Sequence, residues 1–157
     1  MQGNYPETVI EVIDAEMRFR PATLRAVEAF ASSKPWSGSL FERKEKFIKV
    51  NHDLAAAYGA PKPELHFEQI DGTSSGSSYY LPKMHRIVLS GRLSVVTYLH
   101  EFAHALGKDE ADACKWSINL FRQCFPRQFS RLIHRGHMLI RPTDVGRMKV
   151  AAGTISG

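Results

Sequence analysis

The chain has 157 residues, of which 43% are hydrophobic and 24% are charged, and its net charge is +5. This composition is typical of one globular domain, so we expect a single domain over residues 1–157. It contains no apolar run near the roughly 18 residues that a membrane helix needs. The first twenty residues are also interrupted by acidic side chains, so we expect no secretory signal and a cytoplasmic location.

Two helices are predicted in the first part of the chain. Pro21 suits the first position of a helix that runs to about Ser33, because its fixed φ angle fits a helical start. Ser39, followed three residues later by Glu42, forms a capping-box pattern that predicts the start of a second helix. Gly59 is expected to end that helix.

The middle of the chain changes to strand-like patterns. Short strands are predicted around residues 65–70, 79–81 and 86–89, with a polar loop over 71–78 and a turn at Pro82-Lys83. Strands this close in sequence favour a small antiparallel sheet. We therefore expect an α+β fold in which this sheet packs beside helices.

Three more helices are predicted after the strands. Ser94 is expected to cap a helix over residues 94–106, which Gly107 ends. Another helix is expected from Asp109 to about Cys124. Pro126 then begins a short helix that contains Phe129, Leu132 and Ile133. The last stretch, about 141–157, is predicted to be a flexible tail.

The two cysteines, Cys114 and Cys124, fall on one predicted helix. Ten residues of helical rise separate them by roughly 15 Å, which is too far for a disulfide. We expect both to be reduced, buried and packed as small apolar side chains.

The predicted helix 94–106 carries the run His100-Glu101-Phe102-Ala103-His104. Histidines four residues apart lie on one face of a helix, so both imidazoles can bind one ion. Glu101 is rotated about 100° from His100 and stands beside that ion, where a carboxylate can act as a general base for water. The pattern predicts a zinc site with His100 and His104 as ligands and Glu101 as the catalytic base.

A catalytic zinc usually takes a third protein ligand. Glu110 is the favoured candidate, because a sharp turn at Gly107 can bring the residue six places after His104 back to the metal. Asp109 and Asp112 are rivals, or could orient a ligand histidine through its other ring nitrogen. Alternatively, these acidic residues only favour the start of the next helix through its macrodipole.

The run from His100 to Glu110 resembles the zincin class of zinc peptidases. The spacing of His-Glu-x-x-His-x-x-Gly-x-x-Glu is similar to that of metzincins, whereas a glutamate ligand resembles gluzincins and the acidic helix after the motif resembles ImmA/IrrE-like proteins. The resemblance covers mainly residues 86–121. It implies a zincin-like fold, a Zn²⁺ cofactor and hydrolysis of a peptide or protein substrate, with Tyr79–Leu89 along the cleft wall.

The C-terminal third of the chain is basic. Residues 115–157 hold eight Lys or Arg against one acidic residue. This excess favours a solvated cationic face, with weak nucleic-acid contact through residues 115–149 as an alternative. A non-catalytic zincin-like protein that binds a protein or nucleic-acid partner through this region is therefore the second functional hypothesis. Further candidates for a third ligand or an oxyanion stabiliser are left unassigned: His134, His137, Tyr79, Tyr80 and Tyr98.

Overall fold

The computed structural model describes residues 12–73, 77–135 and 138–140. These residues form an α+β arrangement of five helices, a three-stranded sheet and a two-stranded sheet. The helices are α2 (Pro21–Ser32), α3 (Leu40–Tyr58), α4 (Val95–Ala105), α5 (Glu110–Cys124) and α6 (Pro126–Ser130). The strands are β1 (Glu64–Ile70), β2 (Tyr79–Leu81), β3 (Arg86–Gly91), β4 (Ile133–Arg135) and β5 (Met138–Ile140). The α+β prediction is confirmed.

The helix boundaries follow the capping signals in the sequence. Ser39 Oγ accepts a hydrogen bond from the Glu42 amide at 3.1 Å, and the Glu42 carboxylate accepts one from the Ser39 amide at 2.7 Å. Gly59 ends α3 in the left-handed conformation with φ of 58°. Ser94 Oγ accepts from the Thr97 amide at 3.3 Å and so begins α4. Local side-chain chemistry therefore sets these ends, as predicted.

The three-stranded sheet is mixed, so the prediction of an antiparallel sheet is wrong for one of its two strand pairs. β2 pairs with β3 antiparallel, but β1 pairs with β3 parallel, and β3 lies between the other two strands. Burial explains why β3, and not β2, lies in the centre of the sheet and so pairs with β1. Ile87, Val88 and Leu89 of β3 are all buried, whereas β1 and β2 are partly exposed. The most apolar strand takes the centre, where both of its faces are covered.

The end of the described chain also differs from the prediction. The short helix begins at Pro126 as expected but stops at Ser130, and Ile133 lies in β4 instead of in that helix. The amides of Arg131 and Leu132 bond to carbonyls three residues back, which is typical of a helix that is ending. The predicted tail over 141–157 and part of the basic segment 115–149 lie outside the described residues.

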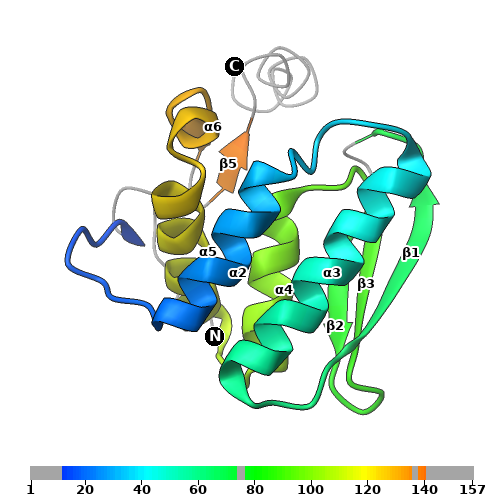
Figure 1. Cartoon of the computed structure of the whole chain (residues 1–157), viewed down its shortest axis with the longest axis horizontal. Coiled ribbons are helices and arrows are strands. Elements are labelled where there is room, and N and C mark those ends of the chain that lie inside the picture. The colour runs from blue at the N-terminus through cyan, green and yellow to red at the C-terminus, as the bar shows by residue number, and fades with distance from the viewer. Residues whose placement is uncertain (1–11, 74–76, 136–137, 141–157) are drawn as a thin grey trace, which may run out of the picture.

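Helix α4 occupies the middle of the molecule and contacts both α5 and the sheet, while α2 and α3 lie side by side in front of it in this view (Figure 1). Aromatic rings join these layers. The Phe47 ring of α3 lies 5.9 Å from Tyr98 of α4, and Phe102 of α4 stacks on Trp116 of α5 at 6.2 Å between ring centroids. The core thereby fixes α4 against both neighbouring helices. No helix in the described parts of the chain is both long and apolar enough to cross a membrane.

A buried polar chain ties α4 to α3 and to the start of the sheet. The Tyr98 side chain is fully buried, and its hydroxyl donates to Asn51 Oδ1 at 2.8 Å. Asn51 Nδ2 in turn donates to the carbonyl of Pro63, just before β1, at 2.8 Å. Burial in this apolar setting holds the pKa of Tyr98 well above its ordinary value. The hydroxyl therefore serves the fold, since it is committed to Asn51 inside the core.

Replacing Tyr98 with Phe should lower the free energy of unfolding by about 1–3 kcal/mol, because the buried Asn51 oxygen loses its donor. Chemical denaturation measures this change. Tyr79→Phe is the matched control: Tyr79 is 38% exposed on β2, so we expect a change within about 0.5 kcal/mol. Equal stability of the two variants would contradict the structural importance of the Tyr98–Asn51 bond.

Candidate metal centre

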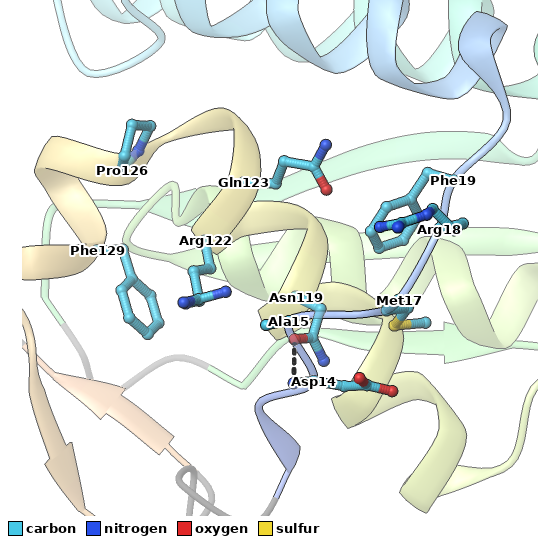
Figure 2. A pocket seen from close by; sticks show the side chains of 10 residues that line it. All are labelled: Asp14, Ala15, Met17, Arg18, Phe19, Asn119, Arg122, Gln123, Pro126 and Phe129. Carbon is cyan, nitrogen blue, oxygen red and sulfur yellow. Dashed lines mark hydrogen bonds between the residues drawn. The ribbon is translucent and has the colours of Figure 1, made fainter.

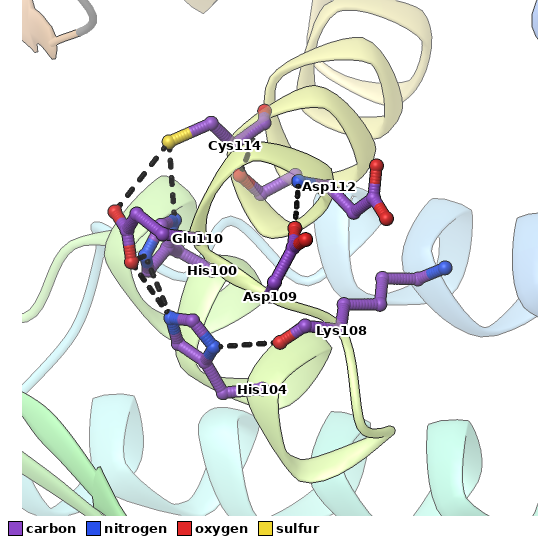
Figure 3. Close-up of polar contacts among 8 residues, drawn as sticks. His100, His104, Lys108, Asp109, Glu110, Asp112 and Cys114 are labelled. Carbon is purple, nitrogen blue, oxygen red and sulfur yellow. Dashed lines mark hydrogen bonds and ion pairs between the residues drawn. The ribbon is translucent and has the colours of Figure 1, made fainter. Parts of the chain in front are cut away.

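The two motif histidines project from the same face of α4. Their ring centroids lie 4.8 Å apart, and Nε2 of His100 lies 3.2 Å from Nε2 of His104 (Figure 3). Both side chains are partly exposed, at 20% and 23%. The helical spacing therefore brings one nitrogen from each ring to a common point that solvent can reach.

The turn after α4 brings the chain back over His104. The Gly107 amide bonds to the His104 carbonyl at 2.9 Å, and the Lys108 amide bonds to the Ala103 carbonyl at 3.1 Å. These two bonds define a Schellman ending, and Gly107 supplies the left-handed residue that it needs, with φ of 95°. The carbonyl of Lys108 then meets Nδ1 of His104 at 2.9 Å. The helix ending thus orients one of the histidines.

Glu110 is the first residue of α5 and reaches both histidines. Its Oε1 atom lies 3.1 Å from Nε2 of His100 and 2.9 Å from Nε2 of His104. The structure therefore brings together the three residues that the sequence predicts as metal ligands: His100, His104 and Glu110.

The proton on His104 can be located from its neighbours. A backbone carbonyl only accepts hydrogen bonds, so Nδ1 must carry the proton that it donates to Lys108 O. In the neutral ring, Nε2 then presents a lone pair toward Oε1 of Glu110, which is also an acceptor. Two acceptors 2.9 Å apart repel each other unless a proton or a metal cation lies between them. The arrangement is chemically suited to binding a cation.

The spacing of the three atoms fits zinc. Zinc–nitrogen and zinc–oxygen distances of about 2.0–2.1 Å place two ligand atoms of a tetrahedral site about 3.3–3.4 Å apart. The three separations among Nε2 of His100, Nε2 of His104 and Oε1 of Glu110 are 2.9, 3.1 and 3.2 Å. A small outward movement of these side chains is enough to form one face of a tetrahedral site. The donor set of two imidazoles and a carboxylate is also one that zinc takes in catalytic sites.

Glu101 follows His100 on α4, is 8% exposed, and interacts through its charge with His104 and Glu110. Burial raises the pKa of Glu101 to about 7; attraction to His104 opposes this rise, and repulsion from Glu110 adds to it. A carboxyl group with a pKa near neutrality can both accept and return a proton. The position and the protonation chemistry of Glu101 therefore suit a general base.

Cys114 borders the cluster, whereas the sequence pattern predicts only a buried apolar side chain at this position. Its Sγ atom lies 3.6 Å from Oε2 of Glu110 and 3.9 Å from Nδ1 of His100 (Figure 3). Burial, together with the neighbouring Glu110 charge, raises the pKa of the Cys114 thiol to about 12. One signal was available: Cys114 is four residues after Glu110 and so shares its helix face. Both cysteines are free, as predicted, but only Cys114 is buried; Cys124 is partly exposed, so the prediction of burial is wrong for it.

The rival acidic ligands point elsewhere. Asp109 caps α5, since its Oδ1 accepts from the Asp112 amide at 2.8 Å (Figure 3). Asp109 and Asp112 are both exposed, whereas Glu110 faces the histidines. The pKa of Glu110 is lowered overall: burial opposes this, but attraction to His100 and the contacts with both imidazoles outweigh it.

Of the other unassigned candidates, Tyr79 is 38% exposed on β2, and the rest are engaged elsewhere or lie outside the described side chains. The Tyr80 hydroxyl contacts Nδ1 of His85 at 2.6 Å, and the Tyr98 hydroxyl is buried against Asn51. The backbone of His134 lies in β4, but its side chain is outside the described part, as is all of His137.

A separate cavity of about 380 Å³ lies between the segment before α2 and the C-terminal part of α5 (Figure 2). It is lined by Asp14, Ala15, Met17, Arg18, Phe19, Asn119, Arg122, Gln123, Pro126 and Phe129. None of these residues belongs to the histidine cluster. The chemistry of the cluster, and not the size of this cavity, therefore identifies the candidate site.

Comparison with known proteins leaves the site geometry as the basis for assigning a function. The chain matches no protein-family model, no curated protein and no solved structure.

Replacing Glu110 with Ala should weaken zinc binding by more than about 100-fold. Removing a residue that only hydrogen-bonds a ligand typically lowers metal affinity by roughly 10–100-fold, and removing the ligand itself should lower it further. Competition with a chromophoric chelator measures the dissociation constant. Asp112→Ala removes the same charge from the same helical turn and should leave zinc affinity within a few-fold of the original.

Asp109→Ala completes the comparison. It should lower the free energy of unfolding by about 1 kcal/mol through loss of the helix cap, with little change in zinc affinity. Wild-type zinc affinity in Glu110→Ala, or a strong loss in Asp112→Ala, would contradict the ligand assignment.

Proposed function

We propose that this protein is a zinc-dependent hydrolase, and specifically a metallopeptidase with a zincin-like active site. The observation that carries the proposal is the convergence of three ligand-type atoms, Nε2 of His100, Nε2 of His104 and Oε1 of Glu110, within 3.2 Å of one another. Glu101 stands beside them, buried, with a pKa raised to about 7. Three protein ligands and an adjacent base are the composition of a catalytic zinc site rather than a structural one.

The role of each residue in the proposed reaction follows from its position. A bound zinc ion supplies Lewis-acid polarisation of the substrate carbonyl and makes water more acidic. His100, His104 and Glu110 hold the ion, and the Lys108 carbonyl keeps the His104 imidazole in the tautomer that presents Nε2. Glu101 takes a proton from the attacking water and returns it to the leaving amine nitrogen.

The sheet offers a place for an extended peptide. β2 lies at one edge of the three-stranded sheet, and α4 packs against both β2 and β3. An edge strand can accept a peptide as an additional strand, which would lay the peptide backbone alongside the helix that carries His100. This arrangement favours an unstructured peptide segment as the substrate over a small compact metabolite.

Replacing Glu101 with Gln should retain zinc and reduce peptide hydrolysis by about 100- to 10,000-fold, because the amide keeps the shape of the side chain but cannot accept the proton. The assay uses the zinc-loaded protein with a pool of unstructured peptides of varied sequence, read by mass spectrometry. Glu45→Gln, an exposed change on α3, is the control and should leave hydrolysis unaltered.

Two outcomes would contradict this proposal. Loss of zinc in a folded Glu101→Gln variant would mean that Glu101 is a ligand and not the base. Absence of any cleavage by the zinc-loaded wild-type protein across the peptide pool would favour the non-catalytic, partner-binding alternative.

A further inference from the structure

We infer that Cys114 is a positioning residue that holds His100 and Glu110 in the orientations in which they face the metal. The inference rests on the proposed metal centre. It gives Cys114 a function beyond filling space in the core.

The first observation is the division of the Glu110 carboxylate. Its Oε1 atom faces the two histidines at 2.9 and 3.1 Å, whereas Oε2 accepts a hydrogen bond from the Cys114 thiol at 3.6 Å. The thiol therefore forms its hydrogen bond with the carboxylate oxygen that does not face the histidines. A carboxylate held in this way presents one oxygen to a metal and cannot rotate freely to present both.

The second observation concerns the ring of His100. Nε2 lies close to His104 and Glu110, and the Cys114 sulfur lies 3.9 Å from the other ring nitrogen, Nδ1. The single proton of the thiol is donated to Glu110, so the sulfur can only accept from His100, and the contact favours a proton on Nδ1. A proton on Nδ1 leaves the lone pair on Nε2, where a metal ligand needs it.

The two histidines are thereby supported in the same way by different groups. Nδ1 of His104 contacts the Lys108 carbonyl at 2.9 Å, and Nδ1 of His100 contacts the Cys114 sulfur. Partners of this kind fix the tautomer and the orientation of ligand histidines. A thiol suits the position at Cys114 because it donates to Glu110 and accepts from His100 at the same time.

The burial of Cys114 makes these contacts persistent. The residue is 3% exposed and packs with Val12 and Ile118 in a small apolar cluster. Water therefore competes poorly for either contact. The same packing keeps the sulfur behind the two ligand side chains.

A different arrangement is possible in principle. One ligand-type atom from each of His100, Glu110 and Cys114 lies within 4.8 Å of the others, so these three residues could hold a metal themselves. That group does not include His104. It would leave His104 without a function, although the Schellman turn orients its Nε2 toward Glu110 Oε1. The geometry favours the positioning assignment, and spectroscopy distinguishes the two.

The first test measures zinc affinity in Cys114→Ala, Cys114→Ser and Cys124→Ala. Cys114→Ala should bind zinc about 10- to 100-fold more weakly, as expected on loss of a supporting contact. Cys114→Ser keeps a donor and an acceptor and should recover part of that loss, which a purely space-filling function of the sulfur would not predict. Cys124 is a second free cysteine on α5 that makes no contact with the cluster in the structure, so Cys124→Ala should match the wild type.

The second test replaces zinc with cobalt(II) in the full chain. The wild-type spectrum should show the visible bands of a tetrahedral site without a thiolate-to-cobalt charge-transfer band, and Cys114→Ala should shift those visible bands. A thiolate charge-transfer band that disappears in Cys114→Ala would overturn the inference by making Cys114 a ligand.

The failures of the two proposals are distinguishable. If the wild-type protein binds zinc and both Cys114→Ala and Cys114→Ser bind it as tightly as the wild type does, only the positioning assignment is overturned. If the wild-type protein binds neither zinc nor cobalt, the metal centre itself is overturned and the positioning assignment with it. If Cys114→Ala does not fold, the comparison of Cys114→Ser with Cys124→Ala decides: an unaltered zinc affinity and cobalt spectrum in a folded Cys114→Ser would overturn the inference.

Discussion

The hydrogen bond between Nδ1 of His104 and the Lys108 carbonyl determines which atom of that imidazole faces Glu110. With the proton placed on Nδ1, the lone pair of Nε2 points at a carboxylate oxygen 2.9 Å away, and Nε2 of His100 adds a third nucleophilic atom. Such a group is stable only around a positive centre, either shared protons or a metal ion. The chemistry that we propose for the protein follows from this constraint.

The rest of the fold serves to hold α4 and the start of α5 in this relation. Stacking of Phe102 on Trp116 joins the two helices through the core, and the Gly107 turn connects them with only a few intervening residues. The buried Tyr98–Asn51 bond fixes α4 from the other side. Because core packing tolerates little displacement, the atoms of the candidate site are held by a rigid scaffold rather than by a loop.

Features that depend on local chemistry could be predicted from the sequence. Ser39, Ser94, Gly59 and Gly107 act on residues within one turn, so they mark helix ends without knowledge of the tertiary structure. The approach of His100 and His104 has the same local origin, since the helical repeat alone sets it. Even the placement of Glu110 depends mainly on the short turn that precedes it.

Features that depend on packing between distant segments could not be predicted in this way. The parallel pairing of β1 with β3 arises because the most apolar strand takes the centre of the sheet, a choice made only when all three strands compete for burial. The contact of Cys114 with His100 likewise requires α5 to pack against α4 at one particular rotation. The helical spacing of Cys114 from Glu110 indicates that the two share a face of α5. Which residue of α4 lies opposite that face depends on how the two helices pack.

The most direct test of the central claim is the zinc content of the purified protein by elemental analysis, compared with that of His100→Ala and His104→Ala. We expect close to one zinc per chain in the wild-type protein and almost none in either variant, because two remaining ligands bind the ion weakly. Circular dichroism establishes that the variants are folded. A wild-type protein free of metal after purification in the presence of zinc, or folded histidine variants that keep a full equivalent, would contradict the account.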